Sequence, residues 1–413
     1  MATLLGNTYV FPLPAGGCCV CIAPNNTAVM GRGLLGGLSG CAQQASAKNT
    51  VFGFRISNYG NASNLKNSVI IGYDAAQGFG NYASCNASCG NTLIGSKAGY
   101  DIRSGSNGTL CGRGNTFFGH RTGWQNQFGS YNIAIGPFAA FSQGNYATHN
   151  IAMGDVALRG YGNTGDRNIA IGCRAYQGAS SNCNDNIFIG NCSGRYAGYR
   201  LGLTAVGFRS SPGGSTQNDK GVSIGAYSSV SGICSTVIGK SATGGDCANK
   251  ISITRNCSPT ATASHTLLGN SSHTRAYINV AWTNVSDCRD KTNIKPLSPN
   301  LGLPFIKKLN PVTFNWDKRS KYVEKCGFEW GQKDGSLVES EEQYGFIAQE
   351  MEEALNELNV KFEALGKQKS EHNLNVDVYD LRYLELISPM VQSLKDLIED
   401  LENAEARLEV LKS

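Results

Sequence analysis

The chain has 413 residues, 51 of them glycine, and a formal net charge of +5. That average combines two compositions, because residues 286–413 hold 17 Lys and Arg against 24 Asp and Glu, whereas residues 1–285 hold 19 against 7. The first part thus carries +12 and the second −7. Abundant Gly, Asn, Ser and Thr with few charges exclude a mainly helical globule for the first part.

The N-terminus lacks a basic start followed by an apolar run, so we expect no secretory signal. No stretch approaches the roughly 20 apolar residues that a membrane-spanning helix needs. We therefore expect folding in a cytoplasm without membrane insertion. The thinly charged first part also gives no reason to expect a nucleic-acid partner.

Residues 1–50 are apolar and glycine-rich, including the run Phe11–Gly17. Such a segment cannot easily form a core of its own. One interpretation is an attachment segment that docks on another protein. The other is an irregular first repeat with Gly31 as its glycine, and both stay open.

A repeat occupies residues 51–245. Each unit has Asn, a short alternating apolar run and Gly, as in Asn132–Gly136, Asn150–Gly154, Asn168–Gly172 and Asn186–Gly190, with a spacing of 17 or 18 residues between Gly136 and Gly225. The alternation predicts a short strand with one buried face, and Gly permits the positive φ of the turn that follows.

A unit this short cannot bury its apolar face alone, so stacked copies should form a quasi-one-dimensional β-structure. The motif resembles the head repeats of trimeric autotransporter adhesins and repeats of phage tail fibres and tail spikes. The resemblance implies a mostly β, homotrimeric β-prism or β-roll of about 18-residue repeats. The motif alone does not separate a trimeric prism from a single-chain solenoid.

Fifteen cysteines are scattered irregularly, and Cys18–Cys21 is their tightest cluster. We expect most of them to be buried thiols, with a disulfide framework or a metal site as the alternative. No His-x-His pair occurs among the five histidines. We therefore expect no metal and no cofactor.

Residues 246–285 are expected to form a neck that ends at Val285, and the composition changes abruptly after it. The next residues read Ser286-Asp287-Cys288-Arg289-Asp290-Lys291. Further landmarks are Leu309–Trp316, Tyr344–Glu350 and the stretch from Tyr379 to Leu397. In this order they resemble the endosialidase-type intramolecular chaperone, a self-cleaving family at the C-termini of phage tail fibres and spikes. The resemblance implies an α+β domain over residues 286–413.

The resemblance also implies a serine–lysine cleavage. Ser286 would attack the carbonyl carbon of Val285, Lys291 would act as its base, and Asp287 and Arg289 would support the turn. A lysine amine accepts a proton only when neutral, and burial without a paired acid favours that form. The alternative is that Ser-Asp merely caps a turn.

Apolar residues recur with a heptad spacing near the C-terminus, as expected of a coiled-coil seam. Its two series are Ile387, Leu394, Leu401, Leu408 and Met390, Leu397, Ala404, Leu411. Pro389 lies within the seam and should kink or start the helix. The alternative is an amphipathic helix packed on its own domain.

Together the resemblances imply a homotrimeric virion protein of a phage tail, made in the host cytoplasm. It would contact a host cell-surface glycan or protein, dock on another tail protein through residues 1–50, and perform only one turnover on its own chain. One alternative is a polysaccharide depolymerase, although residues 1–285 offer few carboxylates for glycoside hydrolysis. Another is a non-viral trimeric surface adhesin.

Overall fold

The computed structural model places the chain in two compact units, Met1–Asn270 and Ser271–Ser413. The structure describes residues 3–5, 8–10, 19–23, 27–32, 49–56, 65–77, 88–102, 112–141, 147–160, 165–178, 183–195, 201–212, 220–230, 233–243, 248–255, 266–269, 276–281, 283–319, 322, 333–369 and 377–412.

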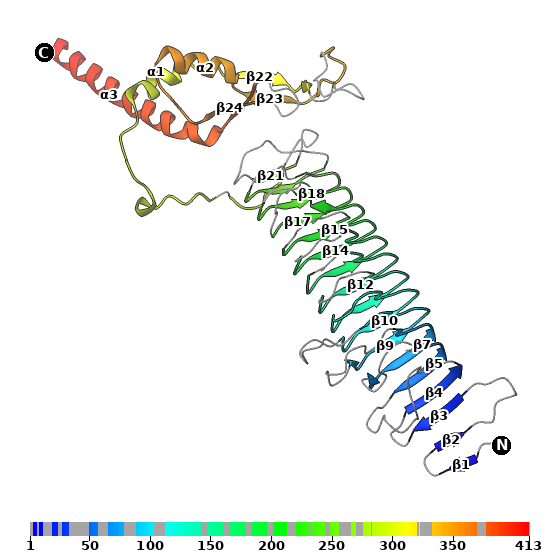
Figure 1. Cartoon of the computed structure of the whole chain (residues 1–413). Coiled ribbons are helices and arrows are strands. Elements are labelled where there is room, and N and C mark those ends of the chain that lie inside the picture. Colours follow the sequence, from blue (N-terminus) through cyan, green and yellow to red (C-terminus); the bar gives the residue numbers. More distant parts are fainter. Residues whose placement is uncertain are drawn as a thin grey trace. The chain divides into compact units, whose positions relative to one another are not determined.

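The first unit is a β-solenoid whose successive turns add one strand each to a 15-stranded sheet (Figure 1). Its strands are β3 (Cys19–Ala23), β4 (Thr27–Arg32), β5 (Thr50–Phe54), β7 (Val69–Tyr73), β9 (Thr92–Ile94), β10 (Thr116–Phe118), β11 (Ile133–Ile135), β12 (Ile151–Met153), β13 (Ile169–Ile171), β14 (Ile187–Ile189), β15 (Thr204–Val206), β17 (Val222–Ile224), β19 (Thr236–Ile238), β20 (Ile251–Ile253) and β21 (Thr266–Leu268). All neighbours pair in parallel except β3 and β4. The predicted mostly β repeat fold is confirmed, and the turns of a single chain form the solenoid.

Three two-stranded pairs accompany this sheet. Strands β1 (Thr3–Leu5) and β2 (Thr8–Val10) are antiparallel, whereas β6 (Leu65–Lys66) with β8 (Ser88–Cys89) and β16 (Ser211–Pro212) with β18 (Ser229–Val230) are parallel. Strand β4 pairs in parallel with β5 and aligns Gly31 with Gly53, as expected if Gly31 belongs to a first repeat. The run Phe11–Gly17 lies outside the described residues.

The core of the solenoid is a column of inward-facing residues, one from the middle of each short strand. Ala134, Ala152 and Ala170 are fully buried, and Phe188 continues the column beside the buried ring of Tyr176. The residues on either side of each middle position face outward. Alternation within three residues therefore separates core from surface.

A ladder of buried asparagines runs beside this column. Asn150, Asn168 and Asn186 are at most 1% exposed. The Asn168 amide group donates to Asn150 Oδ1 at 3.1 Å and to the Cys183 carbonyl at 2.7 Å, and its own Oδ1 accepts from the Asn186 backbone N–H at 3.1 Å. The same bonds recur in preceding turns. Burial of these polar groups is tolerated because they are hydrogen-bonded.

The repeat glycines stack along the solenoid with positive φ, and they permit close packing of the turns. Gly154 has a φ of 132°, and a Cβ there would lie 2.6 Å from the Gly172 carbonyl oxygen. A side chain is thus excluded by sterics as well as by backbone strain. The neighbouring corners use positive φ without glycine, for example at Tyr131, His149 and Arg167.

The second unit has two small antiparallel sheets and a long C-terminal helix, as the predicted α+β domain requires. One sheet pairs β22 (Val312–Asn315) with β23 (Glu342–Gly345), and the other pairs β24 (Leu365–Lys369) with β25 (Asp377–Leu381). The helices are α1 (Leu303–Ile306), α2 (Ala348–Glu357) and α3 (Ile387–Lys412), with short 3-10 turns at Cys288–Asp290, Pro299–Leu301 and Tyr383–Leu386.

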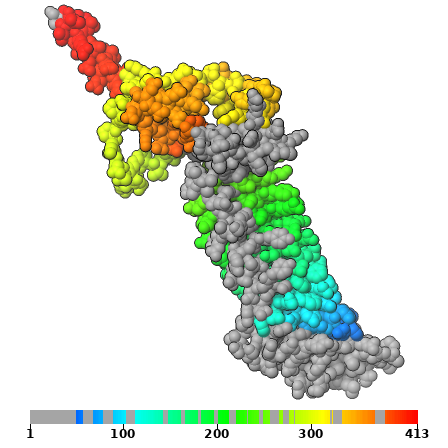
Figure 2. Space-filling view, turned by 45° about the horizontal axis from the view of Figure 1, so that its top comes forward, coloured from blue at the N-terminus to red at the C-terminus, as the bar shows by residue number. Residues whose placement is uncertain are grey.

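The core of the second unit is small. It consists of Leu301, Phe305, Met351, Ala354, Leu355 and Leu386. Only the first turns of α3 join its periphery, where Pro389 and Ser393 are buried, and the rest of the helix extends away from its own unit (Figure 2).

Candidate functional site

The strongest candidate site lies at the start of the charged C-terminal region. A 3-10 turn over Cys288–Asp290 folds the chain back, and Lys291 donates its backbone N–H to the Cys288 carbonyl. This turn brings the Lys291 ammonium nitrogen to 2.5 Å from Ser286 Oγ. The two residues proposed as nucleophile and base are therefore in direct hydrogen-bond contact, the geometry that a serine–base pair needs.

Asp287 and Arg289 form a separate ion pair that holds the turn. Asp287 Oδ1 caps the turn by accepting from the Arg289 backbone N–H at 2.9 Å, and Arg289 Nη2 lies 2.6 Å from Asp287 Oδ2. The hydrogen bonds from Arg289 hold the pKa of the Asp287 carboxyl below its usual range, and Asp287 raises the pKa of the guanidinium. Arg289 thus pairs with the neighbouring carboxylate of Asp287, whereas the Lys291 ammonium group donates to the Ser286 hydroxyl.

In the single chain this site faces water. Ser286 and Lys291 are both exposed, and the Val285 residue that precedes the serine is 86% exposed. A lysine can act as a base only in its neutral form, which burial favours. The geometry of the serine–lysine pair is therefore present in one chain, whereas the dry environment it needs is not supplied by that chain.

A second feature is a hollow of 720 Å³ in the same unit. The three downstream sequence landmarks converge on it. Phe314 and Trp316 come from the first, Phe346 from the second, and Tyr379 from the third. Tyr383 also lines it, and the Tyr383 hydroxyl accepts from the Phe346 backbone N–H at 3.3 Å. The landmarks thus describe one packed region of the domain rather than several sites.

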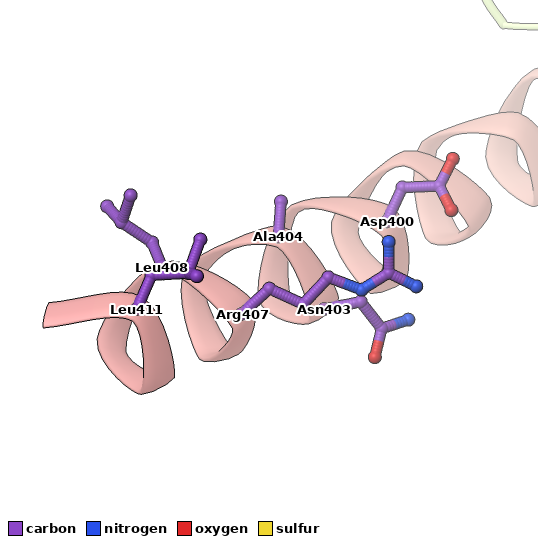
Figure 3. Close-up of a pocket in the computed structure, with 6 residues that line it drawn as sticks. All are labelled: Asp400, Asn403, Ala404, Arg407, Leu408 and Leu411. Atoms are coloured by element: carbon purple, nitrogen blue, oxygen red, sulfur yellow. The ribbon is translucent and has the colours of Figure 1, made fainter. Parts of the chain in front are cut away.

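The predicted coiled-coil seam lies on α3 and is exposed. Leu394, Leu401 and Leu408 are 51–60% exposed, Leu397 is 47% exposed and Leu411 is 84% exposed. Figure 3 shows the last turns, where the described residues that line the hollow beside Ala404, Leu408 and Leu411 all belong to α3. An apolar stripe packed on its own domain would be buried, so the geometry favours the coiled-coil interpretation for these turns.

Sequence reasoning missed the contacts that join α3 to the rest of its unit. The backbone N–H of Leu303, at the start of α1, donates to Asp396 Oδ2 at 3.2 Å. Gln392 donates to the other oxygen of the same carboxylate. Asp396 therefore caps a helix 93 residues earlier in the chain, a pairing without any local signal.

Within the described part of the solenoid and of the second unit, free thiols occur at Cys89, Cys173, Cys192, Cys234 and Cys288, and Cys183 is buried. The side chains of the Cys18–Cys21 cluster lie outside the described residues. Among the residues that the structure places, no group of three or more His, Cys, Asp and Glu side chains could hold a metal ion. No helix in the described ranges is long and apolar enough to cross a bilayer.

Comparison with known families identifies the C-terminal region. Residues 286–360 match the family described as chaperone of endosialidase. No curated protein and no solved structure matches the chain. The matched domain and the solenoid of stacked, about 18-residue turns fit a phage tail fibre with a C-terminal chaperone domain. This domain family implies trimer formation and a tail fibre- or spike-type protein.

Proposed function

We propose that the chain is a homotrimeric phage tail fibre that attaches the virion to the host surface, and that its C-terminal domain cuts itself off between Val285 and Ser286. The observation that carries the cleavage proposal is the 2.5 Å contact between Lys291 Nζ and Ser286 Oγ. The match to the chaperone family begins at this same serine, which supports a domain boundary at the scissile bond.

The proposed reaction is a shift of an acyl group from nitrogen to oxygen. Lys291, in its neutral form, takes the proton of the Ser286 hydroxyl, and Oγ bonds to the carbonyl carbon of Val285. The bond from that carbon to the Ser286 nitrogen breaks, and the nitrogen leaves as an amine with the proton from the lysine. Water then hydrolyses the ester, which restores the hydroxyl and leaves a carboxylate on Val285. One chain is cut once, with no external substrate.

Assembly supplies what the single chain lacks. The serine–lysine pair is exposed, and so is the seam of α3. Packing three α3 helices on one another would bury that seam and bring three copies of the junction close together. Desolvation by neighbouring copies would favour the neutral amine, so cleavage would follow trimerisation. A fibre released in this way keeps its trimer after the folding helper has left.

Adhesion rests on the first unit. Residues 1–285 carry +12, so a screened attraction to acidic surface polysaccharides is expected. Residues 1–50 would dock on another tail protein and fix the fibre to the virion. The receptor would be a host cell-surface glycan or protein.

The test is electrophoresis under denaturing conditions with mass spectrometry on the full chain. We expect the wild type to give two fragments that separate between Val285 and Ser286. Ser286→Ala removes the nucleophile, and Lys291→Arg keeps the positive charge but cannot deprotonate, so both chains should stay intact. Cleavage in either variant would refute the serine–lysine mechanism.

Two controls separate chemistry from folding. Cys288→Ser changes an exposed side chain of the same turn and should still be cut. Light scattering on the Ser286→Ala chain should give three chains per particle. A monomeric particle would contradict the trimer, whatever the result for cleavage.

A further inference from the structure

The sheet of the solenoid presents an outer face whose composition hardly changes along its length. From β5 to β21, the first outward position of every strand in the 15-stranded sheet holds Thr, Val or Ile, and the second holds Phe, Ile, Met, Val or Leu. The strands stack in register, so these residues form two continuous columns. Neither column contains a charged residue in these strands. We call these two columns the sheet face.

Large apolar side chains of the sheet face are open to solvent in the single chain. Phe52 is 51% exposed, Phe118 is 53% exposed, Ile253 is 44% exposed and Leu268 is 59% exposed. At about 4.8 Å between strands, the columns run for roughly 60 Å. Soluble monomers rarely expose contiguous apolar patches beyond about 300–600 Å². A surface of this length and composition therefore requires a cover.

Charged residues of the same turns lie before or after the sheet strands rather than within them. Arg167 and Asp185 form an exposed ion pair at the corner before their strands, and Arg174 is exposed after its strand. The Tyr131 ring, also before its strand, has the guanidinium of Arg113 over it at 5.5 Å. Among the described residues, the segments that flank the strands thus carry charge and the sheet face carries none, the distribution expected of a solvent surface and a buried interface. We call the charged flanking segments the periphery.

We propose that the sheet face is the interface between three copies of this shaft, packed around an axis parallel to the stack of strands. The inference rests on the trimer proposed above and names the surface that forms it. A partner must match the face along its whole length with an equally repetitive apolar surface, and another copy of the shaft has that surface. The C-terminal domain family implies trimer formation. Each shaft is covalently joined to the C-terminal domain of its own chain, so a trimer of these domains holds three shafts at a high effective concentration.

A glycan is a poor occupant for this face, because the sugar hydroxyls would lose water without gaining polar partners. Receptor contacts belong instead on the charged periphery. The arrangement also explains why a shaft with a complete core in each chain can still depend on a trimeric folding helper. Before assembly the apolar columns would be exposed and prone to aggregation.

The first test places a photoreactive benzoyl-phenylalanine in the full chain at Phe118, on the sheet face. The matched control is the same probe at Tyr227, which is 47% exposed and lies after its strand. Illumination should link chains into covalent dimers and trimers from position 118, at a yield at least fivefold above that from position 227. Equal yields in a trimeric particle, or linkage of Phe118 to a different polypeptide, would overturn the assignment.

The second test changes the face without touching the core. Ile171→Glu with Ile189→Glu adds two negative charges on outward positions, and Arg174→Glu makes the same change in charge on the periphery. Circular dichroism should show β-structure in both chains. After cleavage we expect the face variant's shaft to fall from the mass of three chains to that of one, while the control stays trimeric.

The outcomes distinguish this inference from the proposed function. A cleaved face variant whose shaft stays trimeric would refute the sheet face as the interface and leave the trimeric fibre intact. An uncleaved Ser286→Ala chain that is monomeric by light scattering would instead remove the proposed trimer itself.

Discussion

The two units of this chain differ in how much of their apolar surface they bury by themselves. In Met1–Asn270, each strand of the long sheet from β5 to β20 buries one core residue, and the asparagine ladder satisfies its buried polar groups within one chain. In Ser271–Ser413, the core is small and the largest apolar stripe, on α3, stays exposed. The difference indicates that the core of the solenoid can form within one chain, whereas the apolar stripe of α3, like the sheet face of the solenoid, stays exposed in the single chain.

The largest effect is expected on trimer formation, from substitutions in the exposed seam of α3. Leu401→Glu with Leu408→Glu places charges in the proposed coiled coil, where each leucine contributes about 1.5–3 kcal/mol on burial. We expect the trimer fraction of the uncleaved Ser286→Ala chain to fall more than tenfold in sedimentation. The control, Asn403→Glu with Ala406→Glu, adds the same charge away from the seam and should stay trimeric. Equal behaviour of the two variants would remove α3 as the trimer contact.

The next effect concerns the backbone of the solenoid. Gly154→Ala puts a methyl group 2.6 Å from the Gly172 carbonyl oxygen at a φ of 132°, so we expect a loss of about 3 kcal/mol in unfolding free energy. Gly335→Ala in the C-terminal unit meets nothing within 4 Å and should cost about 1 kcal/mol. Denaturant unfolding of both variants measures the two losses of unfolding free energy. A larger loss for Gly335→Ala than for Gly154→Ala would contradict the prediction.

A somewhat smaller effect is expected from the asparagine ladder. Asn168→Ala leaves the buried Asn186 N–H and Cys183 carbonyl without their partner, which should lower the unfolding free energy by about 2 kcal/mol. Asn356→Ala, on the exposed side of α2, should change it by no more than about 0.5 kcal/mol. Hydrogen exchange at the neighbouring turns provides the measurement. Unchanged protection in the Asn168→Ala chain would show that the ladder is dispensable.

The smallest effect belongs to the exposed pair of Arg167 and Asp185. The hydrogen bond from Arg167 lowers the pKa of the Asp185 carboxyl. A lowered folded-state pKa gives stability that is present above the unfolded pKa and is lost as pH falls through the folded one. The melting temperature of Asp185→Asn should therefore be slightly below that of the wild type at pH 7 and equal to it in strong acid. If the difference in melting temperature persisted in strong acid, it would have a cause other than the charge of Asp185.

Much of the candidate site could be predicted because it is local in sequence. Ser286 and Lys291 are five residues apart, and one 3-10 turn suffices to join them. The strand-and-glycine repeat is also local, since alternation and a positive φ are properties of adjacent residues. The heptad pattern of α3 could also be predicted, because it depends only on the spacing of apolar residues along one helix.

The tertiary structure alone decided what depends on distant residues. The motif left a trimeric prism and a single-chain solenoid open, and pairing between turns 18 residues apart decided for the solenoid. The contact of Asp396 with Leu303 spans 93 residues, and the corners at Tyr131 and Arg167 adopt positive φ without glycine. Such features follow from the packing of one turn or helix on another. A pattern of residues adjacent in sequence does not indicate which distant residues they will contact.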